Sequence, residues 1–187
     1  IEISEQYVRS KIFELQPRVT RKPISDDIFL ILHNSTFTRM QELNLPPHPF
    51  KLRKRPDGST EILDPVRNNY IILTPEEWVR QHFVQYLIKD CGLAAGRVAI
   101  EFSIEVNRMA RRCDVVYFDE YGAPVLIVEC KRPSVKINQD TFDQIARYNL
   151  TLNVPYLAVT NGLEHYYCTL DHKNKKYNFL RNLPKLR

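Results

Sequence analysis

Hydrophobic residues along the chain follow two spacings, one typical of strands and the other typical of helices. Apolar residues at every second position, or in short uninterrupted runs, predict strands, whereas spacings of three and four predict helices. The predicted strands lie near residues 98–106, 113–119, 124–131, 155–160 and 165–170, with a helix over about 139–152 after the third of them. This order of helices and strands is typical of an α/β chain.

An earlier helix is predicted to begin at Thr74, because Thr74 can cap it and Pro75 fits its first position. The acidic residues Glu76 and Glu77 in the first turn also favour a helix start. We expect this helix to end near Asp90. Its core-facing residues are predicted to be Val79, Phe83, Tyr86 and Leu87.

The first 45 residues differ in pattern from the rest of the chain. Apolar residues recur there at spacings that suit amphipathic helices, so residues 1–45 are predicted to be a mainly helical N-terminal extension. The proline cluster at 46–49 interrupts any helix, and residues 50–55 and 61–63 flank a Pro-Asp-Gly-Ser turn that predicts a hairpin. We therefore place the main domain at residues 46–187.

The composition is that of a folded globular domain. A chain of 187 residues can form one sizeable core, and its contents of 43% hydrophobic and 26% charged residues are near average. No apolar run approaches the roughly 18 residues that span a bilayer, and the first residues lack the features of a signal peptide, so we expect a cytoplasmic protein without a membrane partner. The four cysteines form no CxxC pair and are expected to be buried thiols.

A formal net charge of +5 and a pI near 9.0 permit a nucleic-acid partner, because a basic surface attracts phosphate. For any single basic residue, however, a solvated surface charge is the more common role. The candidates for contact with the phosphate backbone are Lys51, Arg53, Lys54, Arg55, Arg111, Arg112 and Arg132.

Two opposite charges follow the most hydrophobic of the predicted strands. In the strand that begins at Pro124, alternation places Glu129 and Lys131 on the same face. If both faces of the strand are buried, either charge costs several kcal/mol unless it is paired or coordinated. The structural alternative is a strand end at the surface.

The preceding strand contributes a second carboxylate. Alternation places Asp114 on the face of Val116 and Phe118. If residues 120–123 form a hairpin loop in which Asp119 pairs with Pro124, Asp114 lies opposite Glu129. Directly opposed carboxylates repel, and a divalent cation between their oxygens would remove this repulsion. The pair therefore predicts a site for Mg²⁺ or Mn²⁺, with Lys131 beside it.

These residues resemble the catalytic pattern of the PD-(D/E)xK, or restriction-endonuclease-like, nucleases. Asp114 and the triplet Glu129-Cys130-Lys131 match that pattern, although Cys113 stands where the family usually has proline. Gln144 and Tyr148, on the predicted helix that follows, match the QxxxY motif of one branch of the family. Several motifs in the right order are more specific than any one of them.

The chain is most similar to the N-terminal nuclease domain of type I restriction enzyme R subunits, in the branch of short free-standing proteins. The similarity covers about residue 50 to the end, including Asp64-Pro65, the segment 74–81 and Val159-Thr160-Asn161-Gly162. In this family an acidic residue of the first helix often extends the metal site. The resemblance assigns that role to Glu77, with Glu76 as the alternative.

The resemblance implies a three-layer core with a mixed central β-sheet flanked by helices. It also implies a nuclease, expected to be an endonuclease, that hydrolyses DNA with Mg²⁺ or Mn²⁺ held by Asp114, Glu129, the Cys130 backbone carbonyl and Glu77. Lys131, Gln144 and Tyr148 would complete the catalytic set by contacting the attacking water or the phosphate. The alternative is a non-catalytic module that binds nucleic acid or assembles with other subunits.

R subunits also carry an ATP-driven motor. The sequence contains no GxxxxGK[ST] phosphate loop, so we expect no translocation from these residues. A separate motor or specificity subunit is the protein partner that the resemblance implies.

Overall fold

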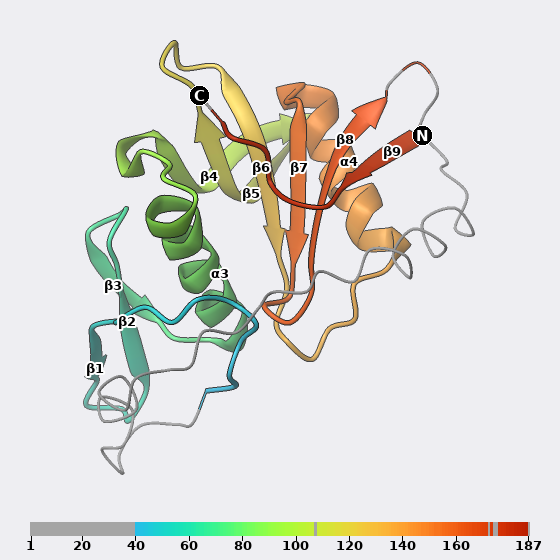
Figure 1. Cartoon of the computed structure of the whole chain (residues 1–187). Coiled ribbons are helices and arrows are strands. Elements are labelled where there is room, and N and C mark those ends of the chain that lie inside the picture. Colours follow the sequence, from blue (N-terminus) through green and yellow to red (C-terminus); the bar gives the residue numbers. More distant parts are fainter. Residues whose placement is uncertain (1–39, 107, 172, 174–175, 187) are drawn as a thin grey trace.

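The computed structural model describes residues 40–106, 108–171, 173 and 176–186 (Figure 1). The strands are β1 (Leu52–Lys54), β2 (Thr60–Asp64), β3 (Asn69–Ile72), β4 (Val98–Val106), β5 (Met109–Phe118), β6 (Pro124–Cys130), β7 (Tyr156–Thr160), β8 (His165–Asp171) and β9 (Lys176–Leu180). The helices are α3 (Pro75–Gln85) and α4 (Gln139–Leu152), with a π-helical turn at Tyr86–Asp90 and a 3-10 turn at Ala95–Arg97. Within the described residues no helix is long and apolar enough to cross a membrane.

The main sheet has six strands in the order β4-β5-β6-β7-β8-β9. Its neighbouring strands are antiparallel, except that β6 and β7 run parallel. A parallel pair needs a crossover connection, and α4 provides it. Helix α3 covers one face of the sheet and α4 the other (Figure 1), so the domain has three layers. The prediction of an α/β fold with a mixed sheet flanked by helices is therefore confirmed.

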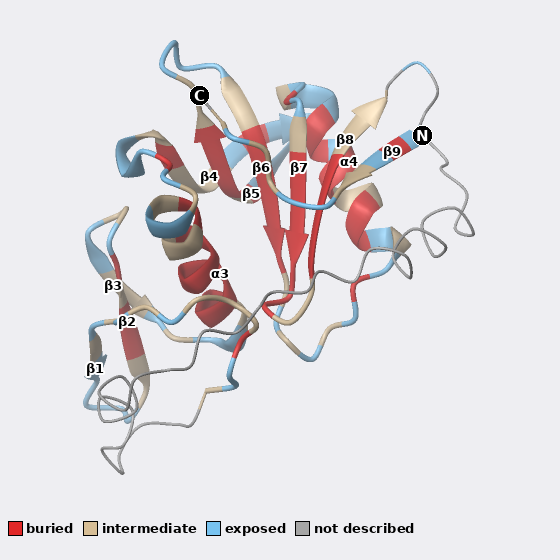
Figure 2. Ribbon diagram, in the orientation of Figure 1, coloured by how far each residue is buried: buried red, intermediate tan, exposed pale blue. Residues whose placement is uncertain are grey.

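A hydrophobic core lies on each face of this sheet (Figure 2). Under α4, Ile127 of β6 belongs to the same buried cluster as Phe142. Under α3, the next residue of the strand, Val128, belongs to the cluster that contains Phe83. Strand β6 is thus buried on both sides, as its uninterrupted run of apolar residues predicts.

Helix α3 begins where the sequence predicts. The side-chain oxygen of its N-cap, Thr74, accepts a hydrogen bond from the Glu77 backbone N–H at 3.0 Å. Helical backbone continues through the π-helical turn to Asp90, so the end of the segment also agrees with the prediction. Of the predicted core face, Tyr86 is half-buried and the others are fully buried, namely Val79, Phe83 and Leu87.

A second, antiparallel sheet of β1, β2 and β3 lies beside α3 (Figure 1). Strands β1 and β2 form the predicted hairpin around Gly58, whose φ of 82° is a backbone conformation that glycine adopts without strain. Ile62 of β2 is fully buried in the core under α3. The small sheet is therefore part of the main domain.

Strand β5 begins earlier than predicted, at Met109 rather than near residue 113. Residues 109–112 are exposed and show no alternation of apolar and polar positions. They are nevertheless paired with β4, from Val106↔Met109 onward, in a long hairpin. Backbone pairing extends this strand where side-chain patterning gives no signal.

The turn from β5 to β6 differs from the prediction by one position. Phe118, not Asp119, pairs with Pro124, and a bulge follows in the ladder. Asp119 leaves the ladder because its carboxylate accepts hydrogen bonds from two backbone amides of the turn. Beyond the bulge, the pair Val115↔Val128 has the predicted register.

The sequence did not predict β3 or β9. Strand β3 (Asn69–Ile72) has only four residues, and β9 (Lys176–Leu180) includes lysine and asparagine. Each lies at the edge of its sheet, where a strand has one neighbour and is only partly buried. These two edge strands therefore carry a weak hydrophobic pattern.

Residues 40–45 contain no helical residue and lie against the main domain. The Asn44 backbone N–H donates to the Gly162 carbonyl at 2.7 Å, and the Trp78 indole N–H donates to the Gln41 carbonyl at 3.0 Å. Leu43 joins the core under α3. The rest of the predicted helical extension, residues 1–39, lies outside the described residues.

The buried ring of His82 leads to a prediction about pH. His82 is 7% exposed, its Nδ1 donates to the Trp78 carbonyl at 2.9 Å, and its ring lies 4.5 Å from that of Phe50. Burial, with a smaller contribution from the charge of His48, lowers the pKa of His82 from 6.5 to about 4. The unfolded chain therefore takes up this proton more readily than the folded chain does.

We expect the stability contributed by the neutral His82 ring to be fully present above pH 6.5 and to be lost as the pH falls toward 4, by about 3 kcal/mol. Urea unfolding of the wild type and of His82→Leu at several pH values measures this loss. The free energy of unfolding of the variant is expected to depend less on pH over this range. Parallel curves for the two proteins would contradict the prediction.

Candidate active site

Asp114 and Glu129 lie on adjacent strands of the main sheet. One step beyond the pair Val115↔Val128, the register brings Asp114 of β5 to the level of Glu129 of β6. There the Asp114 side chain enters the hydrogen bonding between the strands, because its Oδ2 accepts the Cys130 backbone N–H at 2.7 Å. The Asp114 carboxylate is thereby held against the catalytic strand end that the sequence predicts.

The strands are distorted around Asp114. The ladder of β4 with β5 pairs Ile100↔Val115 and Phe102↔Cys113 but skips Glu101, which has a φ of 51°. A non-glycine residue with positive φ inside a strand is strained by about 1–3 kcal/mol and persists only where the surroundings hold it. Such strain is commonly found at functional sites.

This distortion corrects the predicted orientation of Asp114. Cys113, rather than Asp114, shares the core under α4 with Val116, while Asp114 contacts Arg80 of α3. Simple alternation along β5 is therefore wrong at this position. An irregular ladder cannot be deduced from the pattern of apolar residues, because interpretation by alternation takes the strand to be regular.

Glu129, Lys131, Gln144 and Tyr148 form a continuous chain of hydrogen bonds. Lys131 Nζ donates to Glu129 Oε1 at 2.7 Å and to Gln144 Oε1 at 3.1 Å. The Gln144 amide nitrogen donates to Glu129 Oε1 at 2.7 Å and to the Tyr148 hydroxyl at 2.9 Å. Strand β6 and helix α4 thus bring together four of the five predicted catalytic residues, and Asp114 of β5 adjoins them.

The charges of these groups influence one another. Burial and then the charge of Asp114 raise the pKa of Glu129 to about 7, although Lys131 acts in the opposite direction. Burial disfavours the charged form of Lys131, but its hydrogen bond to Glu129 and the charge of Glu129 raise its pKa above 10.5. Lys131 is therefore a cation at neutral pH. Its positive charge does not offset the effects of burial and of Asp114, which together raise the pKa of Glu129.

Glu77, predicted as an additional metal ligand, is buried and paired with an arginine. Its carboxylate accepts hydrogen bonds from Arg80 and, at 2.8 Å, from the Gln81 amide. Burial raises the pKa of Glu77 even though Arg80 lowers it, so for this carboxylate desolvation outweighs pairing. Its neighbour Glu76, the alternative ligand, is half-buried and raises the pKa values of Glu129 and Lys131.

Sequence reasoning missed the arginines and acids that surround the site. Arg80 is buried and donates to Asp114 Oδ1 at 2.9 Å. Arg67, just before β3, donates to the buried Asp64 at 2.5 Å and to Glu101 at 2.6 Å. A signal for Arg80 existed, because it lies one turn after Glu77 and one position after the core residue Val79 on α3.

The predicted phosphate contacts lie in three places. Arg53 of β1 stacks 4.0 Å over the Tyr70 ring and pairs with Glu61, while Lys54 and Arg55 are exposed near the hairpin turn. Arg111 and Arg112 are exposed on β5. The Nη1 atom of Arg112 lies 3.9 Å from Oε2 of Glu101, the acid that also contacts Arg67. Lys51, just before β1, is also exposed. The third place is that of Arg132, which is exposed and directly follows Lys131.

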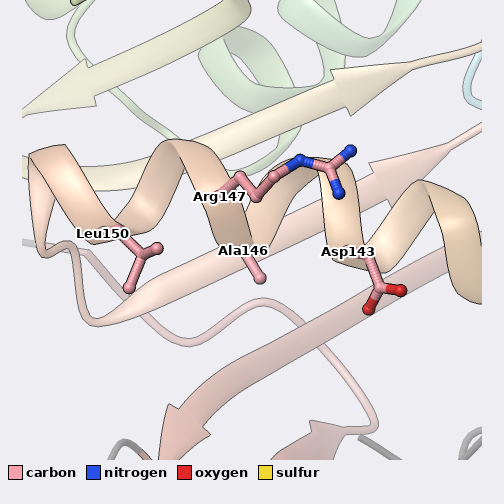
Figure 3. A pocket seen from close by; sticks show the side chains of 4 residues that line it. All are labelled: Asp143, Ala146, Arg147 and Leu150. Carbon is pink, nitrogen blue, oxygen red and sulfur yellow. The ribbon is translucent and has the colours of Figure 1, made fainter. Parts of the chain in front are cut away.

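A pocket lies on α4 apart from the residues described above. Asp143, Ala146, Arg147 and Leu150 line it (Figure 3). None of them belongs to the predicted catalytic set, and Leu150 is 58% exposed. The pocket is therefore not the candidate active site.

The fold and the site define an α/β domain with two carboxylates on adjacent strands and a lysine directly after one of these strands, next to a helix with glutamine and tyrosine. This chain belongs to the family described as Type I restriction enzyme R protein N terminus (HSDR_N), whose model matches residues 75–184. The matched region contains all five predicted catalytic residues.

Among solved structures, the chain is similar to a fragment assigned as an HsdR subunit of a type I restriction enzyme from Vibrio vulnificus YJ016. The two are 17% identical, with a TM-score of 0.43, and the similarity covers 60% of this chain and 24% of that one. The chain thus corresponds to about a quarter of the length of that structure. No curated protein matches it.

Proposed function

We propose that this domain is a metal-dependent nuclease of the PD-(D/E)xK type that hydrolyses phosphodiester bonds in DNA. The observation that carries the proposal is the position of three groups: Lys131 donates a hydrogen bond to Glu129 at 2.7 Å, and Asp114 accepts the backbone N–H of Cys130, between them in the sequence, at 2.7 Å. Membership of the R-subunit N-terminal family supports a nuclease-like domain. A motor or specificity subunit of a restriction complex is the partner that this proposal implies.

The donor set suits Mg²⁺ or Mn²⁺. The described side chains include no group of three or more His, Cys, Asp and Glu residues placed to hold a metal on their own. The site instead supplies the Asp114 and Glu129 carboxylates, to which the Cys130 carbonyl would add a third oxygen. Magnesium is commonly bound by one or two carboxylates together with waters and substrate phosphates, so a pair is sufficient.

When bound, a divalent cation would polarise the scissile phosphate and activate a water for attack. Lys131, held as a cation, would stabilise the negative charge that develops on the phosphate. Gln144 fixes Lys131 and Glu129 relative to each other through its amide group. The Tyr148 hydroxyl accepts a hydrogen bond from Gln144 on the same helix. Helix α4 would in this way position Glu129 and Lys131 at the end of β6.

A cleavage assay tests the proposal. Supercoiled plasmid is incubated with the wild type in Mg²⁺, in Mn²⁺ or in EDTA, beside Asp114→Asn and Glu129→Gln. We expect nicking only with a metal, and a rate at least about a hundredfold lower in both variants. Glu120→Gln, in the exposed turn before β6, is the matched control and should cleave like the wild type.

Equal nicking by the wild type and both site variants would refute the proposal. A wild type that binds DNA but cuts it with neither metal would also refute it, and would indicate a binding or assembly module. A binding titration at two salt concentrations identifies such binding, because phosphate contacts weaken steeply with salt.

A further inference from the structure

A buried arginine lies beside the carboxylate pair. Arg80 is 6% exposed, and its guanidinium donates to Glu77 and, at 2.9 Å, to Asp114 Oδ1. Its Nη1 atom also lies 3.7 Å from Glu101 Oε1. A buried guanidinium is costly unless it is paired, so the acids of α3, β4 and β5 together fix its position.

Arg80 lies where a second cation would have to bind. An ion shared by Asp114 and an acid of α3 would need oxygens within about 2.0–2.6 Å, and would have to displace the guanidinium that now joins Glu77 to Asp114. Arginine stays protonated at physiological pH, so it cannot make room by losing its charge. Its positive charge also repels a metal ion on this side of Asp114.

Oxygens that could bind one cation remain on the side of Asp114 away from Arg80. Among the described residues, Asp114 Oδ2 accepts a hydrogen bond only from the Cys130 backbone N–H. The hydrogen bonds to Glu129 from Lys131 and Gln144 converge on Oε1, and none of the residues that the structure describes hydrogen-bonds Oε2. An ion between Asp114 and Glu129 can therefore bind without breaking the network.

We propose that the site takes a single divalent cation, held by Asp114 and Glu129, because Arg80 occupies the second cation position between Glu77 and Asp114. This inference rests on the proposed function and assigns Glu77 a different role from metal ligand. Glu77 holds Arg80, and Arg80 orients the Asp114 carboxylate from α3. Both are positioning residues in this arrangement.

The number of bound ions tests the proposal directly. Mn²⁺ is titrated into the wild type, Arg80→Gln and the double variant Glu77→Gln/Arg80→Gln, and the free ion is followed by electron paramagnetic resonance. We expect one ion in the wild type, two in Arg80→Gln, and one again in the double variant, which has the net charge of the wild type. Circular dichroism verifies that each variant is folded, and Glu120→Gln serves as the control for ion number.

Two ions in the wild type, or one in a folded Arg80→Gln, would overturn the inference. If Arg80→Gln does not fold, the double variant decides: one bound ion supports the inference, and none identifies Glu77 as a ligand and overturns it. A wild type that binds two ions and cleaves DNA refutes the single-cation inference alone. A wild type that binds no Mn²⁺ refutes both this inference and the proposed function.

Discussion

Replacing Lys131 with alanine is expected to lower the rate of DNA cleavage by about a thousandfold, with little effect on DNA affinity. The Lys131 side chain donates to both Glu129 and Gln144, and its pKa is raised, so its contribution is that of a fixed positive charge. Such a charge stabilises the transition state more than the bound substrate, and its loss should therefore act on the chemical step.

Single-turnover cleavage rates and DNA dissociation constants, measured for the same protein preparations, separate the two effects. Lys89→Ala is the matched control, because Lys89 is exposed on the π-helical turn after α3 and is not one of the predicted catalytic residues. A Lys131→Ala protein that cleaves within about threefold of the wild-type rate would exclude a catalytic role for this lysine.

The largest effect on stability is expected from Phe142→Ala, which should lower the free energy of unfolding by about 3–5 kcal/mol. Phe142 is fully buried under α4, and its ring lies 5.4 Å from that of Phe179 and 5.5 Å from that of Tyr177. The shorter side chain leaves a cavity that these rigid rings cannot close, and it removes favourable aromatic contacts.

Denaturant unfolding measures this loss as a lower midpoint with an unchanged slope. Leu150→Ala on the same helix is the matched control, because Leu150 is 58% exposed and its truncation should change stability by less than about 0.5 kcal/mol. A loss below about 1 kcal/mol for Phe142→Ala would mean that the aromatic cluster can repack around the cavity.

The elements that carry strong local patterns could be predicted from the sequence. Helix α4 has the predicted bounds, from Gln139 to Leu152, because it combines an apolar face with an Asn138 cap. Strand β6 was recognisable from its apolar run, and the spacing of Glu129 and Lys131 correctly placed their side chains together. In these cases neighbouring residues decide the structure, so the sequence is sufficient.

The rest depends on contacts between distant segments. Arg80 faces Asp114 across 34 positions of the chain, and no local pattern records which acid a buried arginine will meet. The irregular backbone at Glu101, which the ladder of β4 with β5 skips, is accompanied by a contact with Arg67, before β3. Likewise, the sequence gives no signal that the Glu77 carboxylate is held by Arg80 and Gln81.

The order of the strands has a consequence for how the site assembles during folding. Strands β4, β5 and β6 are joined by short turns, so closing their pairings costs little chain entropy. The parallel pairing of β6 with β7 must wait for a crossover that runs from Lys131 to Pro155 and contains α4. We therefore expect Asp114 and Glu129 to share a folding unit that closes early, and Gln144 and Tyr148 to reach them only when that slower step is complete.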